Sequence, residues 1–508
     1  MKPQSFFSLM MALALPALNA QDPQAKAIFD GKSLGGWKGM EGFWKVEDGA
    51  ITGETTAPNQ VPFNTFLVWQ DGEVDDFELE FDYKIVGGNS GVQVRSYQMP
   101  GSKAEEFRIA GYQSDIDSGD TYSGIVYSEG ERGILANRGE QTEVGADHKP
   151  KVVQKFGESA ELQKAIKKED WNHFKIVARG NTITNSINGT KLAEVTDNDP
   201  EKARRSGQLA IQLHRWNTPM KIQVKNLMLK RLPLGDKKKI AFFAGRPSHG
   251  AGQHEHRAGC LLMADQLQTH LKDKLVATVY SGGWPNDPSA LDNVDAVVSF
   301  TDGGGGHPLN YHLKELDAAM KRGAGLGCIH YAVETVAGEP GKKFLEWIGG
   351  YFEANWSVNP HWKADFKQLP QHEVTRGVKP FSTNDEWYYH MRFREGMEGV
   401  TPILTTHPPK ETLQRPDGPH SGNPAVRAAI DKGEPQHVMW LATRDGNGRG
   451  FGCTGSHFHK NWANSDYRKL ILNACCWIAH VDVPADGVPS PDLSEEYLSA
   501  NLDPKPKK

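Results

Sequence analysis

The 508-residue sequence lacks several features that would point directly to a function. Lysine and arginine do not cluster and the formal net charge is −5, so there is no basic footprint for nucleic acid or an anionic membrane surface. No G-x-G-x-x-G motif follows a predicted strand, which argues against a dinucleotide-dependent enzyme. Beyond the first twenty residues, no apolar run reaches the roughly 18 residues that a membrane-spanning helix needs. We therefore expect small or neutral partners, no nucleic acid and no membrane insertion.

Cysteine is also scarce. The five cysteines all lie in apolar runs of the second half, and their odd number leaves at least one unpaired: Cys260, Cys328, Cys453, Cys475 and Cys476. So few cysteines in so long a chain do not make a disulfide framework. We expect buried free thiols.

The first twenty residues have the pattern of a secretory signal peptide. Lys2 precedes an apolar stretch from Phe6 to Leu18, and the small residue Ala20 stands before polar QDPQ. This pattern predicts a mature protein that begins near Gln21 and is secreted or periplasmic.

The rest of the chain has two hydrophobic periods. Residues 27–232 alternate with period two, as in FELEFDYKI, and Asn188-Gly189 is a hairpin signal, so we expect an antiparallel β-sandwich of the jelly-roll kind. After a linker at 233–238, continuous apolar strands such as KIAFFAG alternate with helices. This alternation predicts a flavodoxin-like α/β domain with a parallel sheet over 239–481. The Pro-rich tail, 482–508, is expected to be loose or draped over a domain.

One face of the predicted sandwich gathers polar residues. Strand alternation places three groups on faces opposite apolar neighbours: Gln93, Arg95 and Tyr97; Gln113, Asp115 and Asp117; Gln212 and His214. If these strands share a sheet, the combined donors, acceptors and rings suit a sugar. An ordinary solvated sheet face would give the same pattern.

Histidines gather in the loops of the α/β half. Eight of the 19 follow predicted strands that end at one edge of the sheet: His249, His254, His256, His307, His330, His390, His457 and His459. Ligands bind at that edge in open α/β sheets, and neutral imidazoles suit proton transfer or a divalent metal. Exposed loops also tolerate histidine without any such role.

The stretch GLGCIH poses a choice between two reactive residues. Cys328 lies inside the apolar run, whereas His330 falls where the strand turns into the next element. A nucleophile has to be exposed beside a base, so we expect Cys328 to be a buried thiol and His330 to be the functional group.

Two resemblances extend this reading. IFDGKSLGGWKG, FELEFDYKIVGGNSGVQVRS, YSGIVYSEGERGIL and WNHFKIVARGNTITNSING, with three shorter segments, resemble the 3-keto-disaccharide hydrolase domain, a concanavalin-like sandwich. GLGCIH and HFHKNW resemble the class I glutamine amidotransferase-like fold. His330 stands at the elbow and Asn461 in place of the usual Glu, so the triad is broken and glutamine hydrolysis is not expected. With SHG and GGGGHP, residues 238–480 resemble the ThuA-like (trehalose utilisation) family.

The first resemblance implies a hydrolase that cleaves glycosidic bonds in 3-keto-glycosides or 3-keto-disaccharides. With the signal-peptide pattern, we expect this hydrolase to be exported and to act by elimination and hydration. A ketone at C3 acidifies the C2 hydrogen, so one base and one electrophile suffice. We expect Asp115 or His214 as the base and Arg95 as the electrophile. The full set of candidate catalytic residues is Arg95, Gln113, Asp115, His214, His330 and His459. Candidate substrate-binding residues are Gln93, Tyr97, Asp117, Gln212, Trp216, Glu386 and His390. Candidate ligands of a divalent metal are His249, His307 and His457.

The alternative is a non-catalytic carbohydrate-binding sandwich that delivers an α/β domain with an activity of its own. Expressing the two halves separately would separate these readings.

Overall fold

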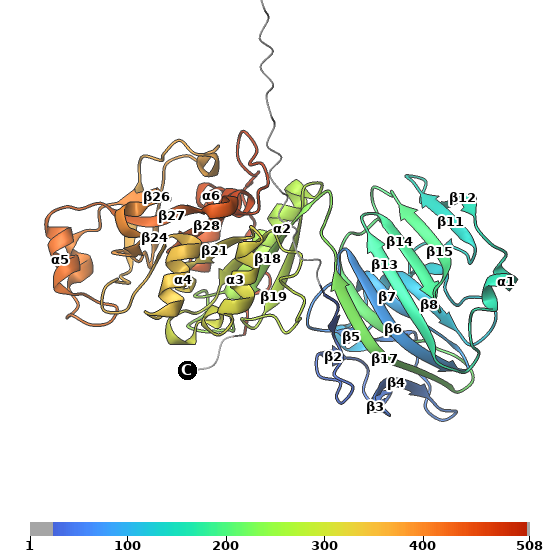
Figure 1. The fold of residues 1–508 in the computed structure, drawn as a ribbon. Coiled ribbons are helices and arrows are strands. Elements are labelled where there is room, and N and C mark those ends of the chain that lie inside the picture. Colours follow the sequence, from blue (N-terminus) through green and yellow to red (C-terminus); the bar gives the residue numbers. More distant parts are fainter. Residues whose placement is uncertain (1–23, 505–508) are drawn as a thin grey trace, which may run out of the picture.

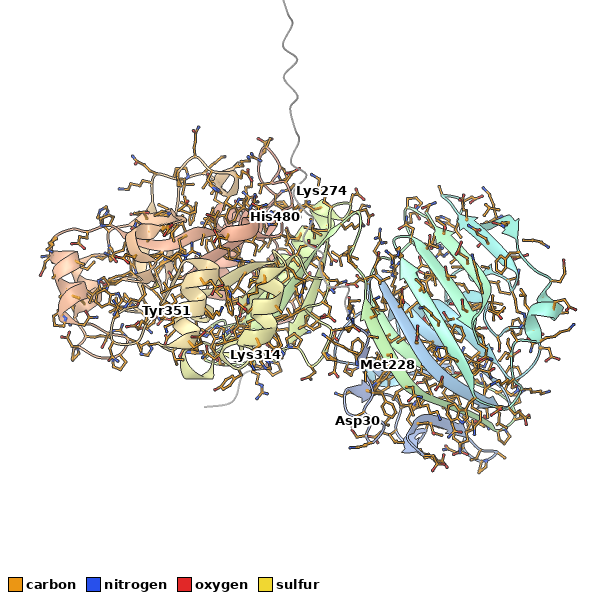
Figure 2. The ribbon with its side chains drawn as sticks, in the orientation of Figure 1. Asp30, Met228, Lys274, Lys314, Tyr351 and His480 are labelled. Atoms are coloured by element: carbon orange, nitrogen blue, oxygen red, sulfur yellow. The ribbon has the colours of Figure 1, made fainter. Side chains whose placement is uncertain are left out.

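The computed structural model describes residues 24–504, so the predicted signal peptide lies outside the described residues. Figure 1 shows two bodies side by side, an all-β domain followed by an α/β domain. Figure 2 shows their side chains, with Met228 on the all-β domain and Lys274 on its neighbour. None of the helices within residues 24–504 is long and apolar enough to cross a membrane.

The all-β domain is a sandwich of two sheets. The first has the order β12 (Pro150–Lys155), β11 (Glu140–Val144), β15 (Thr190–Asp197), β14 (Thr182–Ile187), β13 (Asn172–Arg179), β6 (Phe77–Val86), β17 (Met220–Arg231), β4 (Ala50–Thr55) and β3 (Trp44–Glu47), with β1 (Lys26–Ala27) beside β17. The second has the order β10 (Gly133–Ala136), β9 (Val126–Glu129), β8 (Ile109–Asp117), β7 (Asn89–Gln98), β16 (Gln208–Leu213), β5 (Thr65–Trp69) and β2 (Trp37–Lys38). Pairing is antiparallel except between β11 and β15.

Period-two alternation builds the sandwich core. Phe77, Leu79, Phe81 and Tyr83 of β6 are at most 1% exposed, while the residues between them face outward. Their buried side chains join those of the second sheet in one apolar cluster. Between β11 and β13 the chain forms β12, whose residues are all exposed, and the short helix α1 (Ser159–Gln163). The predicted antiparallel sandwich is confirmed.

The α/β domain is built on a seven-stranded sheet. Its order is β19 (Leu275–Ser281), β18 (Lys238–Ala244), β20 (Ala296–Phe300), β21 (Gly325–Ile329), β28 (Gly448–Cys453), β27 (Gln436–Arg444) and β26 (Val400–Thr406). Two small sheets pair β22 (Gly350–Tyr351) with β25 (Arg392–Phe393), and β23 (Trp362–Phe366) with β24 (Phe381–Asp385). The helices are α2 (His256–Leu271), α3 (Leu313–Lys321), α4 (Glu339–Ile348), α5 (Pro424–Asp431), α6 (Ser465–Ile478) and α7 (Glu495–Ser499).

The sheet of this domain is mixed rather than wholly parallel. The first five strands run parallel, as predicted, whereas β27 runs antiparallel to β28, and β26 runs antiparallel to β27. Continuous apolar strands such as β18 and β21 are buried because apolar side chains cover both faces of the sheet. The five cysteines are buried free thiols, as expected.

The tail is draped over the α/β domain. The Arg468 side chain donates to the Pro491 carbonyl, and the Gln266 amide donates to the Tyr497 hydroxyl at 3.0 Å. Val488 is fully buried. These contacts fix the residues that follow α6 against α2 and α6.

Buried charges join the two domains. Arg231, at the end of the sandwich, pairs with Asp287 of the α/β domain at 2.7 Å. Lys239 of the α/β domain pairs with Asp75 of the sandwich at 2.5 Å, and Asn293 donates to Asp75 at 3.0 Å. Burial alone would raise the pKa of Asp75, but Lys239 and Arg231 lower it to about 2. Buried ion pairs therefore hold the two domains together across their interface.

Candidate functional sites

The sandwich carries a pocket on the outer face of its second sheet. The cavity has a volume of about 340 Å³ and is lined by Asn64, Asn89, Gln113, Asp115, Asp117, Tyr122, Ile125, Tyr127, Glu129, Ile134, His214 and Trp216. It lies on the predicted polar face, opposite the core residues Leu209, Ile211 and Leu213 of β16. The structure thus brings Gln113, Asp115, Asp117, His214 and Trp216 together.

Asp115 is the most perturbed acid of this pocket. It lies near the end of β8 and is 6% exposed. Burial raises its pKa to about 7, the nearby Glu129 and Asp117 contribute in the same direction, and hydrogen bonds from Gln113 and Asn89 oppose the shift. The Gln113 amide donates to Asp115 Oδ1 at 2.5 Å. A carboxyl group that titrates near neutral pH in a cleft is a candidate general base.

A network of amides behind Asp115 fixes its orientation. Gln93 donates to Gln113 Oε1 at 2.9 Å, and Ser96 donates to Gln93 Oε1 at 2.6 Å. Gln113 also lies 3.3 Å from Gln212 Oε1. Gln93 and Gln212 are fully buried, so they support the pocket and do not line it, contrary to their predicted role in binding substrate.

Aromatic side chains stand at the mouth of the pocket. Trp216 is 45% exposed and Tyr122 is 44% exposed. The ring of Trp216 lies edge-on to His214, with centroids 5.5 Å apart, and His214 Nδ1 donates to the Arg215 carbonyl at 2.7 Å. Exposed rings beside hydrogen-bonding groups suit a ligand with one apolar face, such as a pyranose.

The predicted roles of Arg95 and Tyr97 are not supported. Arg95 has a φ of 49°, within the register shift between Val94 and Tyr97, so strict alternation fails there. Its guanidinium is 1% exposed and pairs with Asp76 at 2.7 Å. The Tyr97 hydroxyl donates to Glu131 at 2.6 Å. Neither residue lines the pocket, because the bulge moves both away from it.

Sequence reasoning missed Tyr127 and Glu129, which enter the pocket from β9. In VYSE the side chains alternate, which puts Tyr127 and Glu129 on one face and Val126 in the core. This alternation could have predicted both pocket residues. Asn64 donates to Glu129 Oε1 at 3.0 Å and accepts from the Arg215 amide at 3.0 Å. Asn64 and Asn89 lie next to strand ends, where no periodicity marks them.

A cluster of histidines lies at the carboxyl edge of the α/β sheet. His254, His330, His457 and Glu386 place one ligand atom each within 4.8 Å of one another, and His249, His254 and Asp302 form a second such group. His330 follows β21 and His457 follows β28, so the predicted convergence of strand ends holds for both. His249 stacks on His254 with centroids 3.6 Å apart. Glu386, predicted to bind substrate, belongs to the first group instead.

Four of the eight predicted loop histidines lie outside both groups. His256, the first residue of α2, places its Nδ1 3.1 Å from the Arg246 carbonyl. His307 is buried, and its Nε2 donates to the Ala332 carbonyl at 2.9 Å, so it caps a short helix instead of binding metal. His459 Nε2 donates to the Leu498 carbonyl at 2.9 Å. It does not face His330, because a 3₁₀ turn beginning at His459 ends the alternation. His390 stacks on Trp356, 4.3 Å between centroids, and donates to its carbonyl.

Cys328 is a buried strand thiol, as expected. It is fully inaccessible to solvent, and burial raises its pKa well above the usual range. His330 begins the turn after the strand with a φ of 56°, a conformation that is strained for a residue other than glycine. Of the two, only His330 reaches the histidine cluster.

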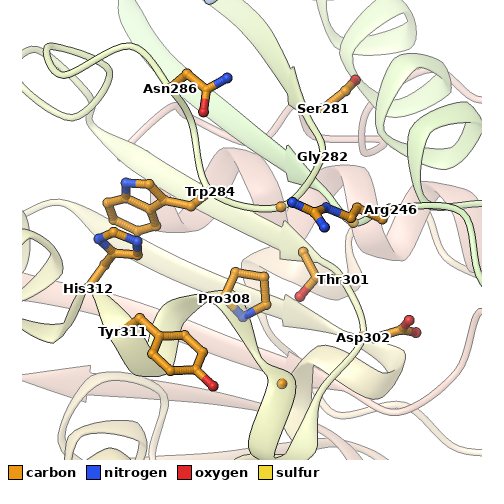
Figure 3. A pocket seen from close by; sticks show the side chains of 13 residues that line it. Arg246, Ser281, Gly282, Trp284, Asn286, Thr301, Asp302, Pro308, Tyr311 and His312 are labelled. Carbon is orange, nitrogen blue, oxygen red and sulfur yellow. The ribbon is translucent and has the colours of Figure 1, made fainter.

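A larger cavity of about 700 Å³ opens beside this cluster, at the ends of β18, β19 and β20 (Figure 3). Figure 3 shows the rings of Trp284 and His312 against each other, and their centroids are 3.9 Å apart. Arg246 and Asp302 also line it. Asp302 Oδ1 accepts from His254 Nδ1 at 2.9 Å, so one carboxylate connects this cavity with the histidine cluster.

Comparisons with known proteins match both halves. A family model described as a 3-keto-alpha-glucoside-1,2-lyase-like domain matches residues 24–230, and one described as trehalose utilisation, ThuA, matches residues 251–478. No curated protein matches the chain.

Solved structures match each half separately. A Bacteroides uniformis protein provisionally described as ThuA-like is 16% identical, with a TM-score of 0.35, over 47% of this chain and 91% of its own. A Parabacteroides distasonis protein provisionally described as a glycosyl hydrolase is 21% identical, with a TM-score of 0.25, over 41% and 94%. The carbohydrate-binding module CBM66 of Bacillus subtilis is 14% identical, with a TM-score of 0.25, over 38% and 95%. The two family models alone therefore place a 3-keto-alpha-glucoside-1,2-lyase-like domain match before a ThuA domain match in this chain.

Proposed function

We propose that the sandwich pocket binds a 3-keto-glycoside and cleaves it by elimination, with Asp115 as the base. The observation that carries this proposal is a buried carboxyl group with a pKa of about 7 in a cleft with exposed rings at its mouth. Both family descriptions name carbohydrates, which supports a carbohydrate-related function for the whole chain.

The chemistry needs one proton to move twice. Asp115 removes the proton at C2, which the C3 ketone acidifies, and the electron pair forms the C1–C2 double bond as the C1–O bond breaks. The protonated Asp115 returns the proton to the departing oxygen, so the products are a free alcohol or sugar and an unsaturated 3-keto sugar. Addition of water, hydrogen to C2 and hydroxyl to C1, gives the 3-keto sugar.

Without Arg95, another group has to polarise the ketone. The residues that line the pocket include neither lysine nor arginine. Tyr127 lies opposite Gln113 in the register of β9 and β8, and burial raises its pKa, which keeps its hydroxyl protonated. Tyr127 is therefore our candidate for the hydrogen bond to the ketone oxygen.

Turnover of a 3-keto-disaccharide by the full-length protein tests this function. Asp115→Asn should lower the rate about 10²- to 10⁴-fold, whereas Glu80→Gln, on the outer face of the other sheet, should not. Because the base acts when ionised, kcat/KM of the parent should fall as the pH drops below about 7. The unoxidised disaccharide should remain uncleaved, since it has no acidified C2 hydrogen.

Two different results would contradict this proposal. Equal rates for the parent and Asp115→Asn would remove the base from this pocket. If the parent binds the sugar without turning it over, the sandwich is a carbohydrate-binding module, the function that its exposed Trp216 also suits.

We also propose that the protein is exported, on the pattern of residues 1–20. Intact mass of the protein from its exporting host should show an N-terminus near Gln21, and retained Met1 would contradict this.

A further inference from the structure

The four side chains of the histidine cluster meet at the spacing of a metal site. His254 Nε2 lies 3.1 Å from His330 Nε2 and 3.1 Å from His457 Nδ1, and the last two are 3.3 Å apart. Ligand nitrogens about 2.0–2.1 Å from a tetrahedral zinc ion lie about 3.3–3.4 Å from one another. Three imidazoles from separate loops therefore lie at nearly the edge lengths of one tetrahedron.

Glu386 supplies the fourth ligand atom. Its Oε2 is 3.2 Å from His457 Nδ1 and 3.5 Å from His330 Nε2. It is the least buried of the four, and the Tyr388 hydroxyl donates to the same oxygen at 3.2 Å. Three imidazoles and one carboxylate favour zinc-like ions over calcium or magnesium, which prefer oxygen ligands.

Hydrogen bonds made by Nδ1 of His330 and of His254 leave the lone pair of each ring on Nε2, which faces the centre of the cluster. His330 Nδ1 lies 2.8 Å from the Thr454 carbonyl, which only accepts, so Nδ1 carries the hydrogen and Nε2 carries a lone pair. His254 Nδ1 lies 2.9 Å from Asp302, so its Nε2 likewise presents a lone pair. Two lone pairs facing each other at 3.1 Å repel, and a cation between them converts that repulsion into two bonds.

The surrounding chain holds the loops in place. Asp385, fully buried beside Glu386, accepts from the backbone amides of Ser456 at 2.7 Å and His457 at 3.0 Å, and from the Asn461 amide at 2.8 Å. His254 and His330 both have positive φ, 45° and 56°. Such strained residues persist where the surroundings fix them, and they concentrate at functional sites.

From these contacts we propose that His254, His330, His457 and Glu386 bind one divalent transition-metal ion of the zinc class. Asp302 orients His254 and lines the 700 Å³ cavity, so it is the outer partner that ties the metal to that space. The site is separate from the sandwich pocket and does not depend on the proposed lyase activity.

Metal content of the full-length protein tests the proposal. After removal of metal with a chelator, the protein is reloaded with Zn²⁺ or Co²⁺ and freed of excess ion. We expect about one ion per chain, and for cobalt a visible absorption band of a tetrahedral centre. His254→Ala and His330→Ala should each lose the ion and the band. His312→Ala, a half-buried histidine at the same sheet edge, should keep both.

A milder variant covers the case in which an alanine variant does not fold. Asp302→Asn keeps all four ligands, and we expect its affinity for Zn²⁺ to fall about 10- to 100-fold. The proposal is overturned if the reloaded parent holds no zinc or cobalt, if it binds only Ca²⁺ or Mg²⁺, or if a folded His254→Ala protein keeps the ion.

Discussion

Asp115 should make the protein less stable as the pH rises, and Asp115→Asn should remove that penalty. In the folded protein its pKa is about 7, against an ordinary value of 3.8. A carboxyl group with a raised pKa binds its proton more tightly when folded, so ionising it costs folding free energy. The cost begins above the unfolded pKa and is complete above about pH 7.

The magnitude follows from the size of the shift. Raising the pKa from 3.8 to about 7 corresponds to about 4 kcal/mol at pH 8, and to about 1 kcal/mol at pH 4.5, because that pH lies less than one unit above the unfolded pKa. Asparagine has the same shape, and its Oδ1 accepts the Gln113 hydrogen bond. We therefore expect the free energy of unfolding of Asp115→Asn to exceed that of the parent by about 4 kcal/mol at pH 8.

Equilibrium urea unfolding of the parent and Asp115→Asn at pH 8 and pH 4.5 measures this difference. Asp48→Asn, at an exposed turn position with a φ of 52°, is the control and should show no pH-dependent gain. If Asp115→Asn changes stability equally at both pH values, Asp115 is not held as a raised-pKa acid. A variant that gains stability as it loses turnover would show that the protein keeps Asp115 for its activity and at a cost in stability.

Three further predictions concern other parts of the chain. Asp75→Asn should destabilise the protein by about 3–5 kcal/mol, since it leaves Lys239 and Arg231 buried without their shared carboxylate, and calorimetry at pH 7 should show the loss. In the parent, this contribution should disappear as the pH falls from about 4 toward 2, because the pKa of Asp75 is lowered to about 2. Trp216→Ala should weaken sugar binding, measured by calorimetric titration, without moving the pH profile of turnover; a shifted profile would place Trp216 in contact with the base. A thiol reagent should find none of the five cysteines in native protein and all five in guanidinium, and a fast native reaction would contradict their burial.

The sequence by itself predicted the strands and their buried faces wherever the hydrophobic periodicity is regular. Alternation in β6 and continuous apolar runs in β18 and β21 encode half-buried and fully buried strands directly, because side-chain direction repeats every two residues. The same rule found Gln113 and Asp115, and it placed Cys328 inside the strand and His330 beyond it.

Where the backbone departs from regular strand geometry, only the tertiary structure shows where a side chain lies. The bulge at Arg95 turned a predicted electrophile into a buried partner of Asp76, and the 3₁₀ turn at His459 separated it from His457. In the histidine cluster, His254 lies 76 positions before His330 and 203 positions before His457, so only folding brings these side chains together. No local pattern specifies which of eight loop histidines meet, because loop conformation depends on contacts such as those of Asp385 with the loop that carries His457.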